Sequence, residues 1–230
     1  MTIWNSALTA HFNGAPQLVL LDLDGTLINS IPDLTSATDN MLSKLNQPLA
    51  GVENVSHWVG NGVDMLVRRA LAKGDEEKAK SFTNEEIATA RQYFDNAYLE
   101  VLSQATGAYP GVEEFLNSVT IPKVLITNKA RMFTELLIQS LGWNKHFVQI
   151  ICGDDLAEKK PSPLPLLHAC NTQGIDPTNT FMVGDSRNDI QAAHAANMPC
   201  VAVSYGYNHG EDIRNAGSDW LVDNLLELLG

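Results

Sequence analysis

The sequence has few cysteines and no cluster of basic residues. Only Cys152, Cys170 and Cys200 occur among 230 residues, and their wide separation indicates neither a disulfide framework nor a zinc site. The formal charge of −12 is spread along the chain, which argues against the basic surface that nucleic acid or an anionic membrane requires. The sequence also lacks an N-terminal signal segment and an apolar run long enough to span a bilayer. For a complete chain we therefore expect a cytoplasmic protein with no nucleic-acid and no membrane partner.

Hydrophobic residues make up 44% of the sequence, enough for a packed core, and one apolar run leads directly into reactive side chains. Leu18 to Leu21 show the pattern of a strand that is buried on both faces of a parallel sheet. Asp22 and Asp24 follow, and Gly25 permits a tight turn that lets both carboxylates converge. Two carboxylates this close repel each other unless a cation lies between them. This stretch alone is consistent either with a magnesium-dependent catalytic site or with a polar turn after a core strand.

From about residue 106 onward, short apolar strands alternate with helical segments. The expected strands are Lys123–Ile126, Val148–Cys152, Thr180–Val183, Cys200–Ser204 and Trp220–Val222. A short helix is expected to end the chain. This alternation is typical of an α/β fold with a doubly wound parallel sheet, to which the first strand also belongs.

Residues 31–105 lack a strand pattern and show helical periodicity throughout. We predict that they form an inserted all-helical cap domain, and that residues 1–30 and 106–230 form the core. An insertion after the first strand would stand above the C-terminal ends of the strands, where open parallel sheets bind ligands. We therefore expect the cap to act as a lid, with hinges near residues 29–32 and 105–107.

Polar side chains follow the later strands too. Thr127 and Asn128 could bind phosphate oxygens, although Thr127 alone is more typical of an ordinary helix cap. Lys160 stands just before a proline-rich segment that would fix the backbone presenting it. Asp185 and Asp189 are four residues apart, so a turn entering a helix would place both near one ion. All these side chains are expected at the same edge of the sheet.

With these residues in this order, the whole chain resembles the haloacid dehalogenase superfamily. The matching motifs are Asp22-Leu-Asp24-Gly-Thr26, Thr127-Asn128, Lys160-Pro161 and Gly184-Asp185-Ser-Arg-Asn-Asp189. The resemblance implies a Rossmann-like core, a helical cap and Mg²⁺ as cofactor. Because dehalogenase relatives lack an acid at the position of Asp24, its presence resembles phosphoryl transfer rather than carbon–halogen cleavage.

The resemblance also implies a role for each residue. Asp22 would be the nucleophile that takes the phosphoryl group, and Asp24 would protonate the leaving oxygen and then activate water. Mg²⁺ would be held by Asp22, the backbone carbonyl of Asp24 and Asp185, with Asp189 in support. The residues expected to bind the substrate phosphate are Gly25, Thr26, Thr127, Asn128 and Lys160. Magnesium and a lysine would together neutralise the repulsion between a carboxylate and a phosphate dianion.

The helical insertion is similar to the cap of bacterial phosphoglycolate phosphatases, notably over Trp58–Leu71. Two glycines in the loop Gly60-Asn61-Gly62 would let the backbone approach a small ligand, and the following helix N–H groups could bind a carboxylate. A plain turn between helices is the alternative. Arg68 and Arg69 could pair with a carboxylate, but a solvated position on the cap surface is at least as consistent with the sequence.

The predicted function is magnesium-dependent hydrolysis of a small phosphomonoester, with 2-phosphoglycolate as the favoured substrate. The alternatives are a sugar-phosphate mutase and a phosphatase for another small metabolite. A non-catalytic phosphate-binding protein is disfavoured because Asp22, Asp24 and Asp185 are all present. The partner is expected to be a small phosphorylated metabolite, and the sequence carries no signal for an oligomeric state.

Overall fold

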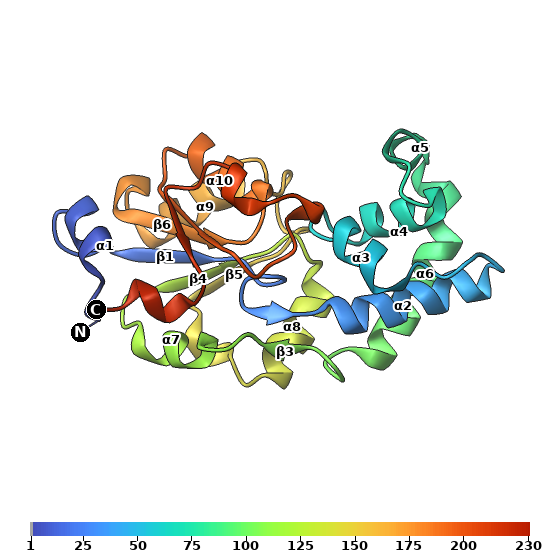
Figure 1. The fold of residues 1–230 in the computed structure, drawn as a ribbon, viewed down its shortest axis with the longest axis horizontal. Helices are drawn as coiled ribbons and strands as arrows, with labels where there is room; N and C mark the ends of the chain where they lie inside the picture. Colours follow the sequence, from blue (N-terminus) through green and yellow to red (C-terminus); the bar gives the residue numbers. More distant parts are fainter. Residues whose placement is uncertain (1) are drawn as a thin grey trace.

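A computed structural model describes residues 2–230 and contains a parallel six-stranded sheet with helices on both faces (Figure 1). The spatial order is β5-β4-β1-β6-β7-β8, and every neighbouring pair is parallel. The strands are β1 (Leu18–Leu21), β4 (Lys123–Ile126), β5 (Gln149–Ile151), β6 (Thr180–Gly184), β7 (Cys200–Val203) and β8 (Trp220–Val222). The predicted α/β class with a doubly wound, Rossmann-like sheet is confirmed.

Helices cover the sheet on two sides, with α9 and α10 on one face and α7 and α8 on the other (Figure 1). The helices of this part are α1 (Ser6–His11), α7 (Val112–Ser118), α8 (Arg131–Ser140), α9 (Leu164–Gln173) and α10 (Arg187–Ala195). Val19 and Leu21 of β1 belong to a hydrophobic cluster that includes residues of α7 and α8. Leu18 and Leu20 belong to a second cluster that includes residues of α9 and α10. The continuous apolar run of β1 therefore supplies both cores.

Short 3₁₀ helices complete this part of the chain. They are η1 (Asn144–His146), η2 (Pro177–Asn179), η3 (Asn208–Gly210), η4 (Ile213–Asn215) and η5 (Leu225–Leu228). The predicted terminal helix is thus a 3₁₀ helix, which Asn224 caps by accepting a hydrogen bond from the Leu226 N–H.

Five helices lie between the first and later strands. They are α2 (Ile31–Lys44), α3 (Gly51–Trp58), α4 (Val63–Ala72), α5 (Glu76–Ser81) and α6 (Asn84–Val101). Buried residues of α2, α3, α4 and α6 form a hydrophobic cluster together with Phe133 of α8. A capping box between Thr83 and Glu86 starts α6. Within residues 2–230, no helix is both long and apolar enough to cross a membrane. The helical cap is thus present, while its division from the core at residues 31 and 105 remains a prediction.

The two links between cap and core lie side by side. Strands β2 (Ile28–Asn29) and β3 (Gly107–Ala108) form a small antiparallel pair that the sequence pattern did not predict. Asp33, only 2% exposed at the start of α2, accepts hydrogen bonds from the backbone N–H groups of Ala105 and Thr106 and from the Thr106 hydroxyl. A buried carboxylate with three donors fastens the start of the cap to its end.

Candidate active site

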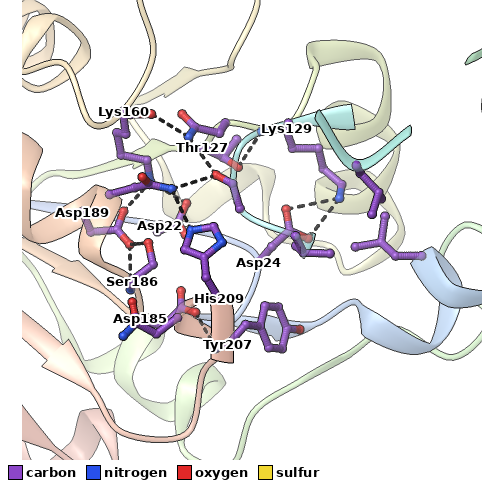
Figure 2. A pocket seen from close by; sticks show the side chains of 18 of the residues that line it. Asp22, Asp24, Thr127, Lys129, Lys160, Asp185, Ser186, Asp189, Tyr207 and His209 are labelled. Atoms are coloured by element: carbon purple, nitrogen blue, oxygen red, sulfur yellow. Dashed lines mark hydrogen bonds and ion pairs between the residues drawn. The ribbon is translucent and has the colours of Figure 1, made fainter. Parts of the chain in front are cut away.

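The C-terminal ends of β1, β4 and β6 are neighbours in the sheet, and the side chains that follow them line one pocket beneath the cap (Figure 2). Of the residues predicted from the sequence, the pocket is lined by Asp22, Asp24, Gly60, Gly62, Thr127, Asn128, Lys160, Asp185 and Asp189. Gly25, Thr26 and Asn61 do not line it.

Gly25 and Thr26 both contact the Asp185 carboxylate. Gly25 has a φ of +88°, and a Cβ added there would lie 2.2 Å from Asp185 Oδ2, so both the backbone conformation and the close approach favour glycine. The Thr26 hydroxyl donates to Asp185 Oδ1 at 2.9 Å. The Tyr207 N–H donates to Asp185 Oδ2 at 2.8 Å. These contacts fix the orientation of the Asp185 carboxylate.

Three buried carboxylates form the most acidic part of the pocket. One oxygen from each of Asp22, Asp185 and Asp189 lies within 4.8 Å of the others. Burial raises the pKa of Asp22 well above its usual range, and the neighbouring Asp189 and Asp185 act in the same direction against Lys160. Burial, followed by the charge of Asp189, raises the pKa of Asp185 to about 7. A cation that prefers oxygen ligands would relieve this repulsion, so the residues fit a Mg²⁺ ion.

Lys160 provides the positive charge within this cluster. Its ammonium donates to Asp22 Oδ1 at 2.6 Å, to Asp189 Oδ1 at 2.7 Å and to the Ile126 carbonyl at 2.7 Å. Burial lowers the pKa of Lys160, but the two carboxylates outweigh it and the pKa is raised. Asp189 also accepts hydrogen bonds from the N–H and hydroxyl of Ser186, which hold it at the start of α10. The hydrogen bonds of Lys160 therefore place a positive charge directly beside Asp22.

The carboxylate of Asp24 points away from this cluster and toward Lys129 (Figure 2). The Lys129 ammonium donates to the two Asp24 oxygens at 3.0 and 3.2 Å, and the Ser30 hydroxyl donates to Asp24 Oδ1 at 2.5 Å. The Lys129 side chain is 4% exposed, and its ammonium lies 5.1 Å from the ring centre of Tyr98 in α6. Asp24 thus has its own counter-ion, on the side that faces away from the other three carboxylates.

Sequence reasoning missed Lys129 as a site residue. The available signal was its place directly after Thr127 and Asn128, at the same strand end. Phosphate binding by Thr127 and Asn128 stays a prediction, and both side chains make hydrogen bonds within the protein. The Asn128 amide donates to the carbonyls of Gly60 and Lys160, both at 2.9 Å. The Thr127 hydroxyl accepts from the Lys129 N–H at 3.1 Å. Asn128 thereby joins the cap loop to the backbone at Lys160, and both of its amide donors are engaged.

The cap loop reaches the pocket through its backbone. Gly60 has a φ of +113°, and a Cβ there would lie 2.8 Å from Cε1 of His209. The Gly60 carbonyl also accepts a hydrogen bond from the Asn188 amide at 3.2 Å, and that amide lies 3.2 Å from His209 Nε2. Two amides, from Asn128 after β4 and from Asn188 in the first turn of α10, thus meet one carbonyl of the cap, which brings the loop directly over the strand ends.

The Asn61 side chain bridges Arg69 and Asn188. The Arg69 guanidinium donates to Asn61 Oδ1 at 3.0 Å and to the Trp58 carbonyl at 2.7 Å, and the Asn61 amide donates to Asn188 Oδ1 at 3.5 Å. A solvated position was the wrong expectation for Arg69, which is only 6% exposed. Its donors satisfy a carbonyl at the end of α3 and a carboxylate oxygen of Glu76, which stabilises the buried charge. Arg69 therefore organises the cap loop.

Two further pocket residues, Tyr207 and His209, come from the loop after β7. The Tyr207 hydroxyl accepts a hydrogen bond from the Ser30 N–H at 2.9 Å. Burial lowers the pKa of His209, with nearby Arg187 and Arg69 acting in the same direction. The sequence places aromatic and polar residues after the strand at this point, but without a recognisable spacing.

Known proteins resemble this chain over most of its length. Residues 19–203 match the family described as "Haloacid dehalogenase-like hydrolase". The "Phosphoglycolate phosphatase" of Nitrosococcus oceani is 44% identical, covering 93% of this chain and 95% of that protein. The "Phosphoglycolate phosphatase 1" of Pseudomonas aeruginosa is also 44% identical, covering 93% and 79% of the two chains.

Among solved structures, the crystal structure of a predicted phosphoglycolate phosphatase from Haemophilus somnus superposes with a TM-score of 0.85 at 34% identity, covering 91% of this chain and 94% of that one. Similarity over nearly the whole length agrees with the order of the strand-end residues. The chain therefore belongs to the haloacid dehalogenase-like hydrolase family, as the sequence motifs predict.

Proposed function

We propose that this chain is a magnesium-dependent phosphatase that hydrolyses 2-phosphoglycolate to glycolate and phosphate. One observation carries the reaction type. Asp22 and Asp24 line the same pocket, yet each pairs with a different lysine, Lys160 at 2.6 Å and Lys129 at 3.0 Å. Two acids in different surroundings can take different roles. The names of the relatives support phosphoglycolate as the substrate.

In the proposed reaction, a carboxylate oxygen of Asp22 attacks the phosphorus while the bond from phosphorus to the leaving oxygen breaks. Asp24 donates a proton to that oxygen, and glycolate leaves. Asp24 then takes a proton from water, whose oxygen attacks the phosphorus and releases phosphate from Asp22. Lys160 neutralises the charge that accumulates around the transferring group, because its ammonium already lies against Asp22.

The side chains of Asp22, Asp185 and Asp189 and the backbone carbonyl of Asp24 would hold the metal ion. When bound, magnesium supplies positive charge that offsets the repulsion between the phosphate and the carboxylates. Thr26 contributes to this function indirectly, since its hydroxyl orients Asp185. We therefore assign Gly25 and Thr26 to the support of the metal site.

The roof of the pocket suits a small leaving group. The cap contributes to the lining the apolar side chains Leu34, Val59, Val63 and Leu66, together with the backbone of Gly60 and Gly62. Apolar side chains exclude water but offer no hydrogen bonds to sugar hydroxyls. This lining favours a short metabolite over the hexose of a sugar-phosphate mutase.

A panel of small phosphate esters, assayed with Mg²⁺ and with a chelator, tests the proposal. Asp22→Asn is expected to abolish the release of phosphate from 2-phosphoglycolate because the amide cannot form the phosphoenzyme. Glu100→Gln, the same chemical change at an exposed residue, is the matched control and should retain full activity. Undiminished activity of Asp22→Asn would refute the mechanism. Isomerisation of a phosphosugar that requires a bisphosphate activator would instead identify a mutase.

A further inference from the structure

Lys129 is the cation in the pocket that the proposed reaction does not use. The three N–H donors of Lys160 are matched by Asp22, Asp189 and the Ile126 carbonyl. Lys129 differs, because its ammonium donates twice to a single carboxylate, that of Asp24, and otherwise faces the Tyr98 side chain. Since one acid takes two of its three donors, Lys129 can exchange one of these contacts for a second anionic partner. It lines the pocket and is held beneath the cap against the ring of Tyr98.

The charges around the pocket show why such a partner matters. Four carboxylates line it, those of Asp22, Asp24, Asp185 and Asp189, against the ammonium groups of Lys129 and Lys160. The proposed Mg²⁺ would offset the charge of its own carboxylate ligands and of the substrate phosphate. A substrate that carries a carboxylate besides its phosphate adds another negative charge, which is strongly unfavourable when buried without a counter-ion.

The described part of the cap supplies no such counter-ion, because its side chains in the lining are apolar. The buried guanidinium of Arg69 is already bound to Asn61, the Trp58 carbonyl and Glu76. Lys129 is therefore the cation best placed for a second anionic group of the substrate.

We propose that Lys129 determines specificity by binding a carboxylate on the leaving group. This inference rests on the proposed phosphatase function and deepens it. Asp24 must reach the leaving oxygen, and the Lys129 ammonium is hydrogen-bonded to Asp24. A substrate carboxylate that binds Lys129 therefore has to be close to the ester oxygen. The preferred substrate class is thus phosphate esters of short hydroxy acids. When the ammonium binds the substrate carboxylate, Asp24 keeps its hydrogen bond from the Ser30 hydroxyl.

The test compares two substrates of equal size, 2-phosphoglycolate and its neutral amide, 2-phosphoglycolamide, with Mg²⁺ present. The wild-type enzyme is expected to prefer the acid by at least about tenfold in kcat/KM, the value of one charge-assisted hydrogen bond. Lys129→Met should remove most of this preference, mainly by raising KM for the acid, while Lys129→Arg retains part of it. Lys145→Met, which removes an exposed lysine in η1, is the control and should leave the preference unchanged.

Two results would refute the role of Lys129 without refuting the proposed phosphatase function. One is an equal kcat/KM of the wild-type enzyme for both substrates, and the other is a Lys129→Met variant whose kcat/KM falls by the same factor for both. The second result would mean that Lys129 only supports Asp24. If Lys129→Met does not fold, the wild-type ratio and Lys129→Arg still decide. A wild-type chain that hydrolyses no phosphate ester would refute the proposed function itself.

Discussion

Mg²⁺ is expected to stabilise the fold by an amount that depends on Asp185. Three buried carboxylates around one position repel each other, and Lys160 compensates for only part of their charge. A divalent ion that binds the folded chain alone adds about 2.7 kcal/mol at a concentration 100 times its Kd. For a chain of this length, about 2–4 °C per kcal/mol converts this into a rise in Tm of about 5–11 °C.

Asp185→Asn separates this effect from general salt effects. The amide removes one charge from the cluster but keeps an oxygen that can accept from the Thr26 hydroxyl or the Tyr207 N–H. The variant should therefore lose most of the magnesium-dependent rise in Tm. Without metal it should be no less stable than the wild type, because one buried repulsion is gone.

Thermal unfolding followed by circular dichroism, with Mg²⁺ or with a chelator at constant ionic strength, measures both effects. The magnesium-dependent rise in Tm should also be smaller at pH 5.5 than at pH 8. The pKa of Asp185 is raised to about 7, so protons compete with the metal at the lower pH and no longer do so above it. An equal rise in wild type and Asp185→Asn, or no rise at saturating Mg²⁺, would refute the assignment of a metal site.

Three further substitutions test other parts of the structure. Lys160→Met should reduce kcat at least about 100-fold in a phosphate-release assay, since it removes the cation beside the attacking carboxylate; activity within tenfold of wild type would contradict this role. Gly60→Ala should lower both kcat/KM for 2-phosphoglycolate and Tm, because the positive φ strains alanine and the new Cβ would displace His209 and move the cap loop; unchanged kinetics would argue against that loop as part of the site. Asp33→Ala should lower the free energy of unfolding by about 1–3 kcal/mol in urea titrations, because it leaves buried donors of Thr106 unpaired.

The fold and the acidic part of the site follow from the sequence because both depend on local patterns. The apolar run Leu18–Leu21 shows the pattern of a strand buried on two faces, and Asp22 comes directly after it. The parallel order of the strands then brings Asp185 to the same edge. In such a sheet the chain direction alone determines which strand ends meet.

Other parts of the site depend on contacts between distant segments, which periodicity does not encode. The role proposed for Lys129 depends on its contacts with Asp24 and with Tyr98 in the cap. The amide of Asn128 donates to the carbonyls of Gly60 and Lys160, and a Thr-Asn pair at a strand end does not predict these two acceptors. Arg69 looked solvated because the sequence does not reveal the carbonyl that it covers.

The alternation of β1 between two cores has a consequence for how the chain finds its register. Because all four residues of the strand are apolar and both faces are covered, sliding the strand by one position would still bury apolar side chains on either face. What opposes the slip is the polar residue at each end: Gln17 would enter the sheet in one direction and Asp22 in the other. The proposed nucleophile thus also opposes a shifted pairing of β1. Replacing Asp22 with leucine would remove one of the two polar residues that fix the register of β1 against β6.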